Sequence, residues 1–142
     1  MMQAWLDGKA IAPHVRGLWT GEGVFETFLW AGNLPRAWPL HVARMQRGAG
    51  RLGLPVPDEG MLAGAVAQAA GTETPWRVRM TWLALGGDLR DLAPDACLLV
   101  ETRPARPLEL APAPARLVTG AALRNPASLL AGCKRLGVAE DL

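Results

Sequence analysis

Lys134 is the residue of this chain whose type and surroundings most suggest covalent chemistry. It closes the segment "RNPASLLAGCK" and is one of only two lysines among the 15 basic residues. Arginine keeps its proton, whereas a desolvated lysine can become a neutral amine, attack a carbonyl carbon and form a Schiff base. From these residues alone, the alternative that Lys134 is a solvated surface charge stays open.

The elements that must position this lysine begin with predicted strands. Asp7-Gly8 separates two short apolar stretches in "QAWLDGKAI", which is typical of a two-residue hairpin. The segment "GVFETFLW", residues 23–30, alternates with the period of a strand and places one set of side chains on each face. Phe25, Thr27 and Leu29 form one face, and Val24, Glu26, Phe28 and Trp30 form the other. A turn at residues 31–33 then predicts a further strand in "LPRAW".

After Pro39 the apolar period becomes that of a helix. One stripe holds Val42, Met45, Ala49 and Leu52, and the strip beside it holds His41, Arg44, Gly48 and Arg51. Gly53 and Pro55 are expected to end this helix. Asp58 can cap a second helix that ends at Gly71. Its expected apolar face consists of Met61, Leu62, Ala65, Val66 and Ala69.

The remainder of the chain predicts more strands. "PWRVRMTWLAL" and "ACLLVET" have the composition of two longer strands, and "ARLVTG" that of another. Four prolines between residues 104 and 114 indicate extended or linker structure there. Strands followed by two helices and then strands favour an α+β domain, with helices packed against a largely antiparallel sheet.

Composition narrows the classes of function. At 142 residues and 50% apolar content, the chain can form one compact domain with its own core. The net charge of +2 comes from scattered arginines, which argues against nucleic acid as a partner. Cys97 and Cys133 have neither metal-site spacing nor a disulfide pattern. No signal peptide or membrane-length apolar run is evident, so we expect a cytoplasmic protein without a membrane partner.

Four short motifs in a fixed order resemble the fold-type IV pyridoxal-phosphate enzymes. They are "GEGVFET" at residues 21–27, "HVARM" opening a helix that closes with "LGLP", "RVRMT" in a strand, and "RNPASLLAGCK". That family includes branched-chain and D-amino-acid aminotransferases and aminodeoxychorismate lyase. The resemblance implies that this chain is the small N-terminal α+β domain of such an enzyme.

The resemblance also implies roles for individual residues. Lys134 would hold pyridoxal phosphate as a Schiff base and move a proton at the substrate's Cα. Arg44 would bind the cofactor phosphate, which suits a planar, permanently charged donor. Phe25 and Thr27 match positions that line the substrate pocket, with core packing as the alternative. No role is assigned to His41, because a histidine beside an apolar stripe is usually a packed, hydrogen-bonded residue.

Among the members of this family, the resemblance favours the lyase of folate synthesis that converts 4-amino-4-deoxychorismate to p-aminobenzoate and pyruvate. "RNP" followed by "LAG" and Lys134 is most similar to that enzyme. Leu29 and Leu85 stand where aminotransferases place arginines that grip carboxylates. The alternatives are a branched-chain or D-amino-acid aminotransferase, or a truncated, non-catalytic remnant that associates with partners through an exposed apolar face.

The resemblance finally implies a division into domains. Residues 1–119 would be the N-terminal domain, and residues 120–142 the interdomain segment and the start of a second domain. In the family that second domain supplies a glutamate for the pyridine nitrogen and more phosphate contacts. The sequence ends eight residues after Lys134, so we expect a fragment or a natural truncation. A homodimer acting on a small-molecule substrate is also implied.

Overall fold

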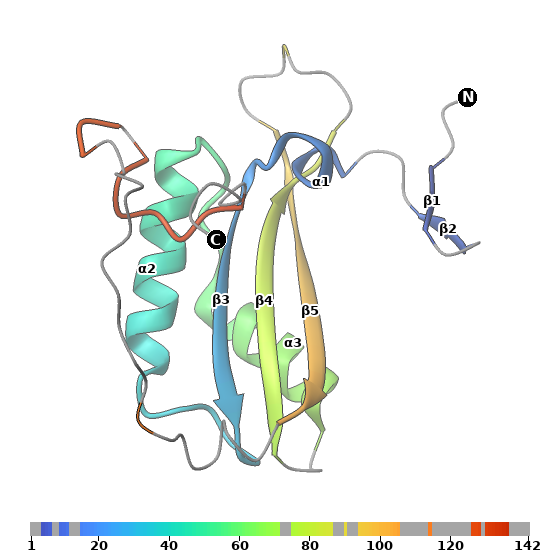
Figure 1. The fold of residues 1–142 in the computed structure, drawn as a ribbon, viewed down its shortest axis with the longest axis vertical. Helices are drawn as coiled ribbons and strands as arrows, with labels where there is room; N and C mark the ends of the chain where they lie inside the picture. The colour runs from blue at the N-terminus through green and yellow to red at the C-terminus, as the bar shows by residue number, and fades with distance from the viewer. Residues whose placement is uncertain are drawn as a thin grey trace.

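The sheet and helices of this chain form a two-layer α+β arrangement (Figure 1). The computed structural model describes residues 4–6, 9–11, 15–71, 75–86, 90, 94–105, 114, 126–128 and 130–136. In chain order the elements are β1 (Ala4–Leu6), β2 (Lys9–Ile11), α1 (Arg16–Thr20), β3 (Gly23–Trp30), α2 (Trp38–Arg51), α3 (Glu59–Ala70), β4 (Trp76–Ala84) and β5 (Ala96–Pro104). Antiparallel strands pair in the order β3-β4-β5, and α2 and α3 cover one face. The predicted α+β class is confirmed.

Strand β3 has the two faces that its alternation predicts. Val24, Glu26, Phe28 and Trp30 are buried toward the helices, whereas Phe25, Thr27 and Leu29 lie on the opposite face. The antiparallel register with β4 places Phe25 opposite Thr81 and Thr27 opposite Arg79. Directly paired residues share a face, so Arg79 belongs to the face without helices. We call this side, which carries Phe25, Thr27 and Leu29, the open face.

Helix α2 begins earlier than predicted, and the expected strand in "LPRAW" is wrong. A turn occupies residues 36–37, and Trp38 is already helical, with Pro39 in the first turn. Proline is well tolerated there because the first helical N–H groups have no acceptor within the helix. Trp38 is buried and packs its ring edge-on to Phe28, with the ring centroids 5.8 Å apart. The burial of Trp38 against Phe28 therefore favours a helix over the predicted strand at this position.

Helix α3 has the predicted ends but a slightly different buried face. Asp58 Oδ1 accepts a hydrogen bond from the Met61 backbone N–H at 2.8 Å, which confirms the cap, and the helix stops before Gly71. The buried residues are Leu62, Val66 and Ala70. Met61 and Ala69 are exposed, so their assignment to the core face was wrong, because the residues of α3 that pack against the core lie at positions 62, 66 and 70.

The N-terminal hairpin is confirmed, with Leu6 of β1 opposite Lys9 of β2. The short helix α1 was not predicted. Its Arg16 Nε donates to Glu22 Oε2 at 2.5 Å across the turn into β3. The strand expected in "ARLVTG" lies outside the described residues, as does most of the segment between Pro104 and Pro114.

The core fills the space between the sheet and the helices α2 and α3. Its buried apolar members are Val24, Phe28, Trp30, Trp38, Val42, Met45, Ala49, Leu54, Leu62, Val66, Ala70, Val78, Met80, Trp82 and Ala84. One carboxylate, that of Glu26, is buried on the same face of β3 as these side chains. Among the helices described, none has both the length and the apolar character needed to cross a membrane.

Candidate functional site

Glu26 is the centre of a cluster of charged side chains. Its side chain has no solvent exposure, and the other three side chains on this face of β3 are apolar. Arg44 donates from Nε to Oε1 and from Nη2 to Oε2, both at 2.5 Å. The Nδ1 atom of His41 lies 2.7 Å from Oε2. An ionised carboxylate only accepts hydrogen bonds, so His41 is the donor in this contact.

The charge on Glu26 is maintained by its partners. Burial by itself would raise the pKa of the carboxyl group, because a low-dielectric surrounding disfavours the charged form. Hydrogen bonds from Arg44 and His41 and the positive charge of Lys134 outweigh that effect and hold the Glu26 pKa below its ordinary value. Hydrogen bonding to Glu26 in turn raises the pKa of Arg44. Glu26 is therefore a buried anion at neutral pH.

Helix α2 delivers these partners from one strip of its surface. His41, Arg44, Gly48 and Arg51 follow each other at helical spacing, and all four face β3 or the segment near Lys134. Gly48 makes the close approach possible, since a Cβ there would lie 2.8 Å from Val24 Cγ1. The predicted strip beside the apolar stripe thus carries the side chains of α2 that contact Glu26 and the segment before Lys134.

Lys134 reaches the cluster from the free edge of β3. The Phe25 N–H donates to the Lys134 carbonyl and the Leu136 N–H donates to the Gly23 carbonyl, both at 2.9 Å. This short antiparallel pairing fits only because Gly23 has no side chain; a Cβ there would lie 3.0 Å or less from atoms of Trp82, Leu83 and Leu136. The backbone of residues 134–136 is consequently fixed to the strand that carries Glu26.

The amine of Lys134 lies between the two faces of the sheet at this edge. Its Nζ is 3.8 Å from Glu26 Oε2 and 5.1 Å from the centroid of the Phe25 ring. The side chain is 34% exposed, and that of Arg44 is 42% exposed. An amine, a guanidinium and an imidazole therefore meet at one buried carboxylate while two of them remain open to a ligand.

Arg51, in the last turn of α2, holds the segment that precedes Lys134. Its Nη1 donates to the Ala131 carbonyl at 2.5 Å and lies 3.9 Å from the sulfur of Cys133. The chain turns here at Gly132, which has a φ of 78° that favours glycine. One helix thus contacts both Glu26 and the approach to Lys134.

Phe25 and Thr27, predicted to line a substrate pocket, lie on the open face of the sheet. The guanidinium carbon of Arg79 stacks 4.2 Å from the Phe25 ring centroid, a distance suited to a cation–π contact. Both side chains are half-buried and are not part of the apolar core on the other face. Their contact with a substrate stays a prediction.

Sequence reasoning overlooked Glu26, which the structure puts at the centre of the cluster. A signal was present, because Glu26 is the single acid in the alternating series Val24, Glu26, Phe28 and Trp30. An acid on a buried face needs cationic partners. The partners themselves come from α2 and from residue 134, far along the chain, which a local pattern does not reveal.

No set of three or more His, Cys, Asp or Glu suited to a metal ion occurs within the described ranges.

Several solved structures are similar to this chain in fold. The chain is similar to a Legionella pneumophila protein provisionally named 4-amino-4-deoxychorismate lyase, with 20% identity, a TM-score of 0.71, and coverage of 87% of this chain and 47% of that one. A second protein with the same provisional name has 27% identity, a TM-score of 0.55 and coverage of 76% and 42%. A branched-chain aminotransferase from the archaeon Thermoproteus uzoniensis has 25% identity, a TM-score of 0.51 and coverage of 72% and 40%.

These similarities cover only part of each known protein. The chain spans less than half the length of the solved structures that it matches. The sequence has no significant match among curated proteins. A family model described as amino-transferase class IV matches residues 23–142, which include Glu26, Arg44 and Lys134. The chain therefore belongs to the class IV aminotransferase family.

Proposed function

We propose that this chain is part of a pyridoxal-phosphate-dependent lyase that converts 4-amino-4-deoxychorismate to p-aminobenzoate and pyruvate. One observation carries the proposal. In a member of the class IV family, the Lys134 amine and the Arg44 guanidinium meet at the same buried carboxylate, at 3.8 Å and 2.5 Å from Glu26 Oε2. That arrangement offers an amine that can react with a carbonyl group and a guanidinium in a fixed position that can bind a phosphate.

The cluster has the donors that pyridoxal phosphate needs. Arginine carries five N–H donors, and two of those of Arg44 go to Glu26. The Arg44 side chain is 42% exposed, so its other donors can serve the dianionic phosphate. Glu26 fixes the orientation of the guanidinium through both of its oxygens. Lys134 is the candidate for the covalent attachment of the cofactor aldehyde.

The chain's own residues would supply positioning and proton transfer. Pyridoxal phosphate, when bound, supplies an electron sink for negative charge at the carbon that bears the amine. Lys134 is then placed to take the proton from that carbon. Loss of this proton and cleavage of the ether bond make the ring aromatic, and the enolpyruvyl group, after taking up a proton, leaves as pyruvate. Glu26 and Arg44 keep the amine and the phosphate in a fixed relation.

Lyase chemistry is favoured over transamination by the open face. Leu29 is 37% exposed there and lies opposite Arg77, at a position where the family's aminotransferases carry an arginine. Two solved proteins provisionally named as the lyase share this fold. The branched-chain aminotransferase of similar fold keeps transamination as the second candidate.

Domain division and assembly complete the proposal. Residues 1–119 form the N-terminal domain, and residues 120–142 lead into a second domain like the part of the solved relatives that this chain does not cover. That second domain would contribute the carboxylate for the pyridine nitrogen, and two copies would form a homodimer in the cytoplasm.

Product analysis tests the reaction. The full-length protein, supplied with pyridoxal phosphate and 4-amino-4-deoxychorismate, should release p-aminobenzoate and pyruvate in equal amounts, and Lys134→Ala should release neither. Consumption of an amino donor with formation of its keto acid would instead assign the aminotransferase. A full-length protein that performs neither reaction would contradict the proposed enzyme.

A further inference from the structure

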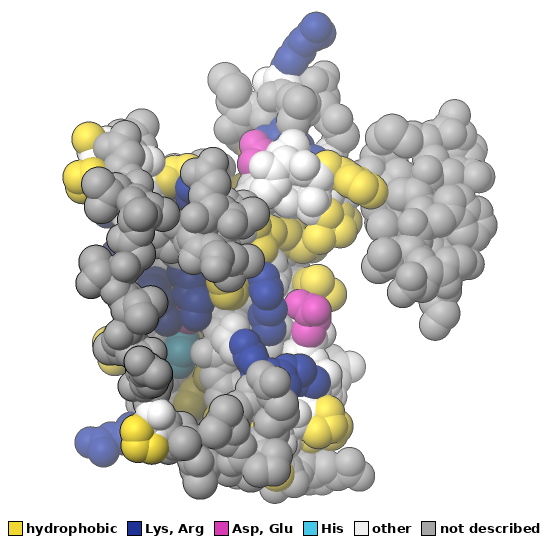
Figure 2. All heavy atoms as spheres, in the orientation of Figure 1, with side chains coloured by type: hydrophobic (Ala, Val, Ile, Leu, Met, Phe, Trp, Pro, Cys, Tyr) yellow, Lys and Arg dark blue, Asp and Glu magenta, His cyan; other side chains and the backbone are white. Residues whose placement is uncertain are grey.

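His41 binds Glu26 from the first turn of α2 but takes no part in the proposed reaction. Its Nδ1 lies 2.7 Å from Glu26 Oε2, and its side chain is 15% exposed. Its backbone N–H donates to the Ala37 carbonyl at 3.1 Å, and its ring lies against that of Phe28, with the centroids 5.4 Å apart. Figure 2 shows an imidazole next to basic side chains on this side of the molecule. The imidazole is therefore held in place by the helix, by a packed ring and by the carboxylate.

Three nitrogen atoms converge on one oxygen of this carboxylate. Arg44 Nη2 is 2.5 Å from Oε2, His41 Nδ1 is 2.7 Å from it, and Lys134 Nζ is 3.8 Å from it. A carboxylate oxygen has two lone pairs, and the two shorter contacts use both. The distance to Lys134 exceeds the usual limit of an N–H···O hydrogen bond, about 3.2 Å. The Lys134 amine thus lies beside the anion without a hydrogen bond to this oxygen.

The missing hydrogen bond affects the reactivity of the Lys134 amine. An amine attacks a carbonyl carbon only in its neutral form, and a hydrogen bond from the ammonium to a carboxylate favours the charged form. Without the donor of His41, one lone pair of Oε2 would be open. The flexible lysine side chain, which is 34% exposed, could then turn its ammonium toward that oxygen. His41 therefore competes with Lys134 for the carboxylate, and its contact makes it easier for the amine to lose its proton.

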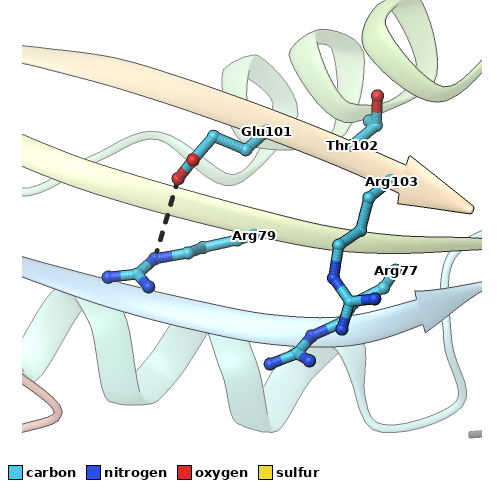
Figure 3. A pocket seen from close by; sticks show the side chains of 5 residues that line it. All are labelled: Arg77, Arg79, Glu101, Thr102 and Arg103. Carbon is cyan, nitrogen blue, oxygen red and sulfur yellow. Dashed lines mark ion pairs between the residues drawn. The ribbon is translucent and has the colours of Figure 1, made fainter. Parts of the chain in front are cut away.

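The other charged groups described near this site are directed elsewhere. Arg51 donates to the backbone that precedes Lys134. On the open face, Glu101 extends toward Arg79, with 3.8 Å between its Oε2 and the Arg79 Nε (Figure 3). A pocket on that face is lined by Arg77, Arg79, Glu101, Thr102 and Arg103. The carboxylate that Lys134 approaches is thus that of Glu26, on the other side of β3.

We propose that His41 is a positioning residue that keeps the Lys134 amine available as a nucleophile by occupying Glu26 Oε2. The inference deepens the proposed function and rests on it for the role of Lys134. Arg44 serves the same oxygen but also has the phosphate as its proposed ligand, whereas His41 acts through the carboxylate alone. Glu26 thereby holds the lysine near the cofactor without retaining its proton.

Competitive acetylation of lysines tests this inference without measuring catalysis. The full-length protein, freed of cofactor, receives a trace of acetic anhydride at pH 7, and the acetylation rate of Lys134 is read from its peptide relative to that of Lys9. His41→Phe keeps an aromatic ring but has no donor, and His41→Asn keeps an N–H donor close to the position of Nδ1. Gln46→Met is the matched control, because it removes another side-chain donor of α2.

We expect Lys134 in His41→Phe to be acetylated about fivefold or more slowly than in the wild type at pH 7, as for the partial loss of a hydrogen bond to a charged group. His41→Asn and Gln46→Met should stay within about twofold of the wild type. The loss in His41→Phe should shrink as the pH rises to about 10.5, since lysine gives up its proton there in any surroundings. A loss that is equally large at high pH would indicate blocked access to the amine and would argue against the inference.

Folding of each variant is checked by thermal unfolding followed by circular dichroism. His41→Leu, which also lacks a donor, is measured in parallel, so that the comparison does not depend on the fold of one variant. Wild-type acetylation of Lys134 in both donor-free variants, or an equal loss in His41→Asn, would overturn the inference. Since no product of the lyase or the aminotransferase is measured, failure of the proposed function and failure of this inference give different results.

Discussion

Replacing Glu26 by glutamine removes the negative charge that His41, Arg44 and Lys134 share, with almost no change in shape. Three hydrogen bonds of 2.5–2.7 Å end on this carboxylate, and hydrogen bonds to charged groups each contribute about 1.5–3 kcal/mol. Glutamine keeps one acceptor oxygen but turns its amide donors toward cationic partners. Because Arg44 and Lys134 are partly exposed and can regain water, we expect a loss well below the sum of the three bonds, about 2–3 kcal/mol of unfolding free energy at pH 7.

The assay is urea unfolding of the cofactor-free, full-length protein, followed by tryptophan fluorescence. Glu101→Gln is the matched control, since this acid is exposed and its contact with Arg79 is 3.8 Å long. An exposed pair contributes at most about 1 kcal/mol, so the control should unfold nearly as the wild type does. A loss below about 0.5 kcal/mol in Glu26→Gln would refute the view that Glu26 organises the cluster.

The stability difference between the wild type and Glu26→Gln should also depend on pH. The pKa of Glu26 in the folded protein is lowered, so its stabilisation is present above the ordinary carboxyl pKa and is lost as the pH falls through the lowered value. The difference between wild type and Glu26→Gln should therefore shrink in acid, as the carboxylate facing His41, Arg44 and Lys134 takes up a proton. A difference that stays constant from pH 7 to pH 3 would contradict the assigned charge.

Three further predictions concern single side chains. Arg44→Ala should weaken pyridoxal phosphate binding by about 1.5–3 kcal/mol, with partial recovery in Arg44→Lys and no change in Arg47→Ala, measured by absorbance titration; an unchanged dissociation constant in Arg44→Ala would argue against the phosphate contact. Arg51→Ala should slow the attachment of the cofactor and speed proteolysis near Ala131, and Arg51→Lys should restore part of both, whereas wild-type rates in Arg51→Ala would remove its positioning role. Burial raises the pKa of Cys97, so iodoacetamide at pH 7 should modify it more slowly than it modifies glutathione, and equal rates would contradict the burial effect.

Local patterns were sufficient to predict most of the elements that hold the site. The two faces of β3 and the Asp58 cap are confirmed, because alternation and capping depend on neighbouring residues. The "LPRAW" prediction failed because burial of Trp38 against Phe28 is a tertiary effect. The helix α1 was missed because it has only five residues and no capping side chain at Val15.

The contacts of the site were less predictable than its elements. The helical strip of His41 and Arg44 is visible in the sequence, but its partner Glu26 is 15 and 18 residues away. The pairing of Lys134 with Phe25 depends on a backbone contact across more than 100 residues. Arg77 and Arg103 become neighbours only through the register of β4 and β5. Such long-range placement follows from packing and strand pairing, which a single sequence does not specify locally.

Trapping of the cofactor tests the central claim most directly. The full-length protein is incubated with pyridoxal phosphate and reduced with borohydride, and its peptides are mapped by mass spectrometry. The account predicts a phosphopyridoxyl group on the peptide that contains Lys134, with Lys9, the other lysine of this sequence, serving as an internal control that stays unmodified. Modification of Lys9 alone, or of neither lysine, would contradict the assignment of Lys134 as the residue that holds the cofactor.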